Sequence, residues 1–278
     1  MKYFAPAKVN LALHVTGRRG DGYHLLDSLV VFADVGDWID IRASREIALS
    51  VSGPRAAGVP TDRSNLVWRA AEAFGTDRGA TIRLDKHLPH AGGIGGGSAD
   101  AGAALRGLAE LWRVPLPAPD ALLDIGADIP VCAASAPARM RGIGDMLDPV
   151  PPIPPLWLVL ANPGVEVPTG PVFRALASTD NPPLPEPDWS DAEGLLRWLA
   201  DTRNDLEHAA MALVPEVGTV LDALGATDGC RLARMSGSGG TCLGVFTEAE
   251  AARAAARHLQ EAHRHWWVEA AAVLTRAP

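Results

Sequence analysis

The sequence predicts an α+β fold made of two domains, and three observations support this prediction. Strand-like and helix-like segments interleave along the chain, but without the strict rhythm of a doubly wound sheet. A proline-rich segment at 149–155 interrupts them, because proline lacks a backbone donor and fixes φ. The 278 residues are also enough for two cores. We therefore expect an N-terminal domain over 1–150 and a smaller C-terminal domain over 151–278.

The individual elements follow from hydrophobic periodicity. Alternating or short continuous apolar runs predict strands at 9–15, 38–41, 47–51, 81–84, 156–161 and 241–246. Apolar residues recurring at helical spacing predict helices at 66–74, 98–112, 192–200, 215–224 and 248–262. A second proline-rich stretch, 182–187, is predicted to be a surface loop inside the second half of the chain.

Composition argues against several classes of protein. Apolar residues make up 47% of the chain and charged residues 21%, which is typical of a globular protein. The net charge of −8 argues against nucleic acid or an anionic membrane as a partner, because both require a basic face. The N-terminus lacks the apolar region of an export signal, and no apolar run is long enough to span a bilayer. Three irregularly spaced cysteines suggest neither a disulfide framework nor a zinc site. We expect a cytoplasmic protein.

The most informative segment is glycine-rich and joins a predicted strand to the helix predicted at 98–112. Glycine lets backbone N–H groups turn toward a ligand, and a helix N-terminus adds unpaired donors and partial positive charge. Together these features predict a phosphate-binding loop. The alternative is a flexible turn with Ser98 as an ordinary N-cap. The residues of the predicted loop are Pro89, His90, Ala91, Gly92, Gly93, Ile94, Gly95, Gly96, Gly97, Ser98 and Ala99.

The common nucleotide-binding loops do not match this segment. A P-loop ends in Gly-Lys-Ser/Thr, and the segment contains no lysine. A dinucleotide-binding fingerprint that began at Gly93 would require glycine in place of Ser98. The His-Arg-Asp and Asp-Phe-Gly motifs of protein kinases do not occur in the chain. The segment therefore belongs to a less common class of phosphate-binding loop.

The loop resembles the ATP loop of the GHMP kinases, a superfamily of small-molecule kinases. Two further segments, 5–11 and 235–242, resemble the N-terminal and C-terminal motifs of that superfamily and occur in the expected order. Within it, four short motifs are similar to those of the kinases that act on cytidine-diphosphate-linked methylerythritol. They are Gly20–His24, Gly126–Pro130, Val167–Thr169 followed by Phe173, and Asn204–Glu207. The chain departs from the usual pattern at Ala91 and Ala99, where the family has glycine and serine.

This resemblance implies a two-domain GHMP-kinase fold with the active site in the cleft. The implied activity is ATP-dependent phosphorylation of the 2-hydroxyl of the cytidyl substrate, in the methylerythritol phosphate route to isoprenoid precursors. Two alternatives stay open: another GHMP kinase, of homoserine or mevalonate type, and a non-catalytic ligand sensor with the same fold. We expect ATP and Mg²⁺ as cofactors, since Mg²⁺ bridges the phosphates in phosphoryl transfer. The expected oligomeric state is a monomer or a weak homodimer.

Two residues are candidates for catalysis. Lys8 is one of only three lysines in a chain rich in arginine, which hints at a need for a compact ammonium, although a solvated strand lysine is the alternative. Asp128 precedes Ile129-Pro130, where a turn or helix-start carboxylate is also common. The resemblance implies that Asp128 faces the substrate hydroxyl as a base and that Lys8 orients it. The sequence leaves open whether Asp128 takes the proton or only positions the hydroxyl.

The resemblance also implies a pocket for the second substrate. Its residues are Asn10, Tyr23, His24, Thr169 and Phe173. Tyr23 is one of two tyrosines, and His24 offers directional hydrogen bonds to a pyrimidine edge. Ser98 is the only protein ligand that we suggest for Mg²⁺. Asp205, in the Asn204–Glu207 motif, is interpreted as structural.

Overall fold

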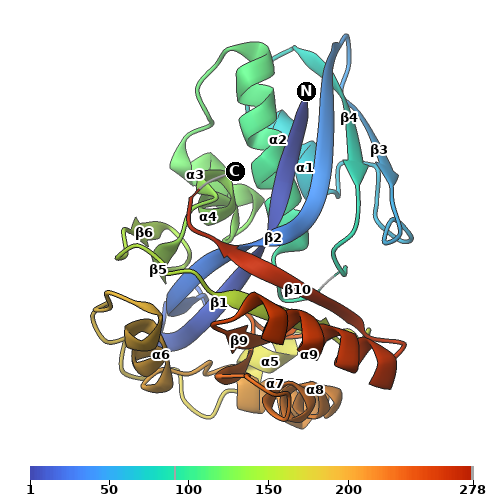
Figure 1. Ribbon diagram of the computed structural model, residues 1–278. Helices are drawn as coiled ribbons and strands as arrows, with labels where there is room; N and C mark the ends of the chain where they lie inside the picture. The colour runs from blue at the N-terminus through green and yellow to red at the C-terminus, as the bar shows by residue number, and fades with distance from the viewer. Residues whose placement is uncertain (91, 277–278) are drawn as a thin grey trace.

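A computed structural model describes residues 1–90 and 92–276, so the predicted loop position Ala91 lies outside the described residues. Over these described residues the fold is α+β, as predicted, and ten strands form one connected sheet (Figure 1). The strands are β1 Lys2–Arg18, β2 His24–Ser44, β3 Ala48–Ser52, β4 Gly79–Asp85, β5 Ala138–Gly142, β6 Met146–Asp148, β7 Trp157–Asn162, β8 Leu232–Met235, β9 Cys242–Phe246 and β10 Trp267–Leu274. The helices are α1 Leu66–Glu72, α2 Gly96–Trp112, α3 Pro119–Ile125, α4 Ile129–Ala134, α5 Thr169–Arg174, α6 Ala192–Ala200, α7 Glu207–Leu213, α8 Glu216–Gly225 and α9 Ala249–Ala262.

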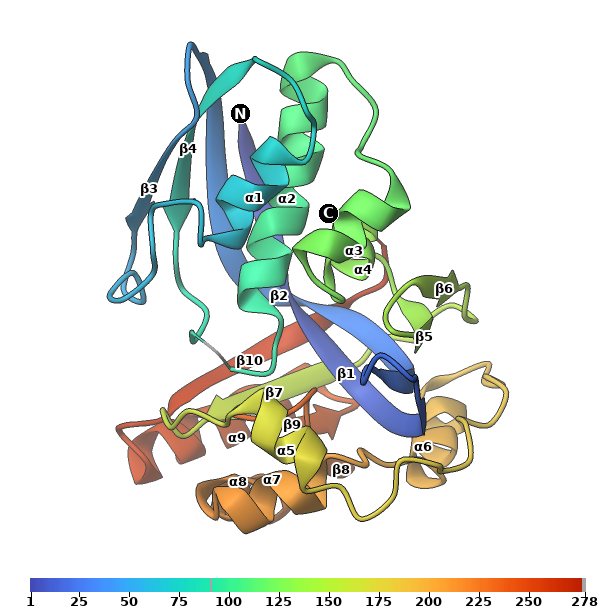
Figure 2. The same cartoon turned by 180° about the vertical axis from the view of Figure 1, so that it is seen from behind.

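The N-terminal half is built on a long antiparallel pair, β1 and β2. Strand β5 pairs with the first part of β2, and β4 pairs with its last part. Helices α1 and α2 lie on one side of these strands, as the view from behind shows (Figure 2). Alanines on α2 let the helix approach closely, and the buried side chains of Phe32, Ile41 and Leu108 fill the space between. This packing fixes the N-terminus of α2, where the phosphate loop ends.

The C-terminal half is a smaller antiparallel sheet of β7, β8, β9 and β10, on which α8 and α9 pack. Strand β10 pairs with β7 over most of its length and then with β2 at Val273 and Leu274. One strand therefore joins the two sheets. The segment 149–155 lies between β6 and β7, and the division into domains near residue 150 stays a prediction.

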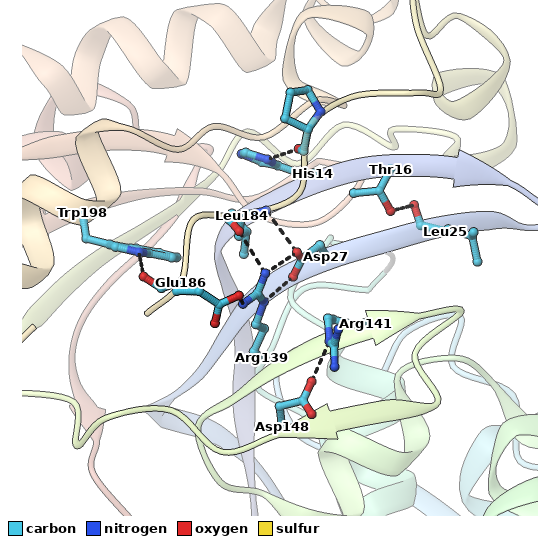
Figure 3. Close-up of polar contacts among 11 residues, drawn as sticks. His14, Thr16, Leu25, Asp27, Arg139, Arg141, Asp148, Leu184, Glu186 and Trp198 are labelled. Carbon is cyan, nitrogen blue, oxygen red and sulfur yellow. Dashed lines mark hydrogen bonds and ion pairs between the residues drawn. The ribbon is translucent and has the colours of Figure 1, made fainter. Parts of the chain in front are cut away.

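The proline-rich segment 182–187 is a loop, but the prediction that it lies on the surface is wrong for part of it. Leu184 is buried, and the backbone on either side is held by side chains of the sheet (Figure 3). Arg139 donates to both carboxylate oxygens of Asp27 and to the carbonyl of Leu184, and it also pairs with Glu186. A buried arginine with this many acceptors anchors the loop.

The structure also finds elements that periodicity did not predict. These are β5, β6, β8, β10, α3, α4, α5 and α7, all of them eight residues or shorter. Short elements contain too few apolar positions to define a period. Within the described part of the chain, no helix has the length and apolar character needed to cross a membrane.

Candidate functional site

Helix α2 begins at Gly96, two residues earlier than the sequence predicted. Its N-cap is Gly95, which has φ 57°, and no side chain caps this end of the helix. Ser98 lies inside the first turn, so the interpretation of Ser98 as an ordinary N-cap is wrong. An uncapped N-terminus of a 17-residue helix presents several backbone N–H groups and the positive end of its dipole. This arrangement suits a phosphate group.

A second glycine-rich turn, 236–240, packs directly against the phosphate loop. Gly93 has φ 71°, and a Cβ at this position would lie 2.3 Å from the carbonyl oxygen of Gly239. Ser236 Oγ donates to the carbonyl of Gly93 at 3.1 Å, while it accepts from the backbone N–H of Asn10. Two backbones meet here with no room for a side chain, which explains why the motifs at 89–99 and 235–242 are both rich in glycine.

The Asn204–Glu207 motif holds this second turn in place. The Asn204 amide donates to the carbonyls of Met235 and Gly237, each at 2.8 Å. Asp205 Oδ2 accepts from the backbone N–H of Val15 at 2.7 Å. The geometry is thus compatible with a structural role for Asp205.

Lys8 and Asp128 form an ion pair next to the loop. Lys8 Nζ lies 2.9 Å from Asp128 Oδ2, with the lysine side chain 4% exposed and the aspartate side chain 31% exposed. The aliphatic part of Lys8 runs under the loop, since a Cβ at Gly95 would lie 3.2 Å from it. Asp128 is the N-cap residue of α4, but its side chain does not cap the helix and is free to face Lys8. A buried ammonium thus meets a half-exposed carboxylate beside a helix N-terminus.

Two cavities meet at this ion pair. The first has a volume of about 420 Å³ and is lined by the loop glycines, Lys86, Asn65 and Leu66. The second has a volume of about 730 Å³ and is more apolar. Lys8, Asp128, Ser98, Thr169, Gly237 and Ser238 line both cavities. Molecules bound in the two cavities would therefore have the ammonium and the carboxylate between them.

The structure brings together all five residues predicted to bind the second substrate. Asn10, Tyr23, His24, Thr169 and Phe173 line the second cavity. The rings of His24 and Phe173 stack with centroids 4.7 Å apart, and Tyr23 is exposed. Burial lowers the pKa of His24, and the nearby Arg18 guanidinium lowers it further, so the ring stays neutral near pH 7.

Asn10 is the most informative of these five residues. Its Nδ2 donates to Ser28 Oγ at 2.7 Å, whereas its Oδ1 is buried and has no hydrogen-bond partner. A buried polar atom without a partner costs free energy, and such an atom in a cavity wall marks a place for a ligand donor.

The sequence did not single out a buried cluster of Lys86, Asp37 and Asp100 below the loop. Lys86 Nζ binds both carboxylates. Burial raises the pKa of Asp100 well above its usual range, against the opposing effect of Lys86, and the carboxylate of Asp37 raises it further. The rarity of lysine was a signal for Lys86 as much as for Lys8. No sequence signal marked Asp37 or Asp100, because the partner of each lies far away in sequence.

Comparison with known proteins agrees with this geometry. Residues 65–147 match the N-terminal domain of the GHMP kinases, and residues 181–265 match their C-terminal domain. The chain is 60% identical over 271 residues to a 4-diphosphocytidyl-2-C-methyl-D-erythritol kinase of Jannaschia sp. (strain CCS1), covering 98% of this chain and 96% of the relative. A kinase of the same name from Paramagnetospirillum magneticum is 52% identical, with 98% of each chain covered.

Solved structures agree as well. A crystal structure of 4-(cytidine 5'-diphospho)-2C-methyl-D-erythritol kinase superposes with a TM-score of 0.81 at 35% identity, covering 98% of this chain and 99% of the other. A homoserine kinase from Cytophaga hutchinsonii superposes with a TM-score of 0.67 at 19% identity, covering 99% and 95%. The similarity to the homoserine kinase shows a shared fold only.

Proposed function

The chain belongs to the GHMP kinase family, and from that premise we propose that it transfers a phosphoryl group from ATP to 4-diphosphocytidyl-2-C-methyl-D-erythritol. The acceptor is the 2-hydroxyl, and the reaction belongs to the methylerythritol phosphate route to isoprenoid precursors. The observation that carries the proposal is the position of the Lys8–Asp128 pair where a phosphate-loop cavity meets a cavity lined by aromatic side chains.

The first cavity is the site proposed for ATP. The backbone N–H groups of Gly96, Gly97 and Ser98 at the open end of α2 would bind the phosphates. Nearby Lys8 supplies a positive charge, which is needed because charge spreads over the transferred group in the transition state. Val59, Pro60, Ser64, Asn65 and Leu66 line the same cavity and form the surface proposed for the adenine ring.

Mg²⁺ fits this site although the described residues contain no group of three or more potential metal-binding side chains. Magnesium keeps several waters and is usually bound by one or two protein oxygens together with substrate phosphates, so it needs no protein cage. Ser98 lines the first cavity and offers such an oxygen. When bound, the ion would neutralise charge on the phosphates.

Asp128 is the proposed base for the substrate hydroxyl. Its carboxylate lines both cavities, so one oxygen can face the hydroxyl while Oδ2 stays with Lys8. The ammonium orients the carboxylate through its contact with Oδ2, and it lies close to the proposed position of the transferred phosphate. In this arrangement Lys8 both orients the base and stabilises the developing negative charge.

The second cavity is the proposed site of the cytidine diphosphate and methylerythritol groups. The stacked pair of His24 and Phe173, with exposed Tyr23, provides flat surfaces for a pyrimidine. The neutral His24 ring can donate or accept a hydrogen bond at the base edge. Asn10, whose Oδ1 has no hydrogen-bond partner among the described residues, and Thr169, hydrogen-bonded to Ser238, also line this cavity and are the polar groups proposed to bind the substrate.

The homoserine and mevalonate alternatives are disfavoured by this second cavity. A cavity of about 730 Å³ with stacked rings exceeds what a small aliphatic alcohol needs. The sensor alternative is disfavoured by the intact Lys8–Asp128 pair. We further propose that the protein acts in the cytoplasm as a monomer or weak homodimer. Its three unpaired cysteines are compatible with a reducing compartment.

The test is ADP release with a panel of alcohols. With ATP and Mg²⁺, the cytidyl substrate should support turnover, whereas homoserine and mevalonate should not exceed the background ATPase rate. Comparable turnover with either small alcohol would favour that alternative kinase. A protein that binds the cytidyl compound in calorimetry but releases no ADP with any alcohol would be a sensor.

A further inference from the structure

The buried cluster below the phosphate loop has no direct part in the chemistry proposed above. Lys86 Nζ lies 2.5 Å from Asp37 Oδ2 and 2.8 Å from Asp100 Oδ2. None of the three side chains is more than 3% exposed. Such burial removes each charge from water, and a buried ion cluster often stabilises a fold no better than apolar side chains would. Its place in the structure therefore has to be explained by something other than stability.

The cluster binds both ends of the phosphate loop. At the start of the loop, Asp37 Oδ1 accepts from the backbone N–H groups of His87, at 2.5 Å, and Leu88, at 2.8 Å. At the end of the loop, Asp100 lies in the second turn of α2. Because the Lys86 ammonium holds both carboxylates, it ties the two ends together with the glycines between them.

The cluster also lies against the loop. A Cβ at Gly96, the first residue of α2, would be 3.1 Å from Lys86 Nζ. Lys86 and Asp100 line the same cavity as the loop glycines. A shift of the ammonium by a few tenths of an ångström would thus displace the backbone that is proposed to bind phosphate.

We propose that Lys86, Asp37 and Asp100 are positioning residues that fix the phosphate loop, so that the transferred phosphate of ATP lies at Lys8 and Asp128. This inference rests on the proposed function. The glycine loop has few side chains that could limit its backbone motion. The contacts of the cluster with both ends of the loop limit that motion instead. Fixing reactants in this way accounts for much of enzyme catalysis, and a misplacement of 1 Å can cost about a hundredfold in rate.

The test compares two substitutions at Asp100. Asp100→Ala removes the acceptor and releases the α2 end of the loop, so kcat/KM for ATP should fall by about 10- to 100-fold. The KM for the cytidyl substrate should change less than about twofold, because that substrate binds in the other cavity. Asp100→Asn keeps an oxygen that accepts from Lys86 and should hold kcat/KM within about threefold of the wild type. Lys86→Met would leave two buried carboxylates without a cation and is expected not to fold.

Asp27→Asn is the matched control. Asp27 is also a buried carboxylate on β2 with a cationic partner, Arg139 (Figure 3), but its side-chain hydrogen bonds are with Arg139 and Leu184 rather than with the loop. This variant should lower Tm and leave kcat/KM for ATP unchanged when it is assayed well below its Tm. The inference is overturned if folded Asp100→Ala keeps wild-type kcat/KM. It is also overturned if Asp100→Asn is as defective as Asp100→Ala, or if Asp27→Asn shows the same loss.

A binding measurement separates this inference from the proposed function. Titration calorimetry with ATP alone needs no acceptor alcohol, so it reports on the loop even if the acceptor has been wrongly identified. Weaker ATP binding by Asp100→Ala than by Asp100→Asn and the wild type would support the inference, and equal binding would overturn it. Failure of the wild type to release ADP with the cytidyl substrate would count against the proposed function only.

Discussion

His24 and Phe173 stack on each other, with ring centroids 4.7 Å apart and an angle of 28° between the ring planes. His24 begins β2 and Phe173 lies in α5. The contact between them therefore joins the two halves of the chain in the wall of the second cavity. The stacked pair thus fixes the position of one aromatic side chain from each half of the chain in the wall of the second cavity.

Phe173→Ala should raise KM for the cytidyl substrate by about 5- to 150-fold, because stacking on one aromatic side chain contributes about 1–3 kcal/mol. The ring is expected to lie far from the reacting hydroxyl, so the contact is equal in the ground and transition states and kcat should stay unchanged. Steady-state kinetics with each substrate varied in turn would measure this. A higher KM for ATP with an unaffected cytidyl KM would reverse our assignment of the two cavities.

Asp128→Asn should lower kcat by about 10²- to 10⁴-fold, because the amide keeps the shape of the carboxylate but cannot take a proton. Substrate affinity should change little, and Tm should confirm that the variant is folded. Rapid-quench measurement of the chemical step is the appropriate assay. Near-normal turnover in a folded variant would remove Asp128 from the role of base.

Gly93→Ala should weaken ATP binding and lower Tm together, because the added Cβ would meet the Gly239 carbonyl at 2.3 Å and φ is positive. Gly225→Ala is the control, at a helical glycine outside both cavities where the nearest neighbour of a Cβ is Ala233 Cβ at 3.8 Å. It should be tolerated, with ATP affinity within about threefold of the wild type, since alanine also favours the helix. Equal effects of the two substitutions would contradict the interlocked-loop geometry.

Stability should fall below about pH 6.5 because of His14. Its Nδ1 donates to the Pro182 carbonyl while its Nε2 accepts from the Arg203 N–H, and the second contact requires the neutral ring because a protonated Nε2 cannot accept. Burial lowers the pKa of His14 below its ordinary value of 6.5. The unfolded chain therefore binds a proton that the folded protein does not, and stability is lost as pH falls through this window, by up to about 1.4 kcal/mol per pH unit.

Urea unfolding at pH 7.5, 6.5 and 5.5 would measure this dependence against His14→Gln. The variant should be less stable at pH 7.5, because glutamine cannot make both contacts equally well, but its stability should fall less steeply below pH 6.5. Parallel pH profiles for the two proteins would show that His14 does not carry the effect.

The sequence predicted the parts of this molecule that depend on local pattern. The phosphate loop was found because glycines between a strand and a helix are unusual, and α2 because its apolar face repeats over 17 residues. Its start was misplaced by two residues, since Gly96 and Gly97 are poor helix formers and only the tertiary contacts of the loop make them helical. The residues of the second cavity were chosen through family motifs rather than physics.

Non-local features could not be read from the sequence. Asp37, Lys86 and Asp100 lie on β2, after β4 and on α2, and nothing near any of them predicts that they meet. The same holds for Leu184, whose burial in a proline-rich loop depends on Arg139 and Asp27. Local composition indicates where a chain turns, but the partners that bury the turn come from distant strands.

The pairing of β10 with both β2 and β7 has a consequence for biosynthesis. The edges of β2 and β7 that receive β10 have no partner until residues 267–274 have been synthesised, because Val273 pairs with Ala33. Emerging strands with open edges are prone to pair with other chains. The chain must also close a very long loop before this contact forms, which slows folding. We therefore expect the two parts of the sheet to join late in folding, and the unpaired edges of β2 and β7 to be exposed to other chains before that step.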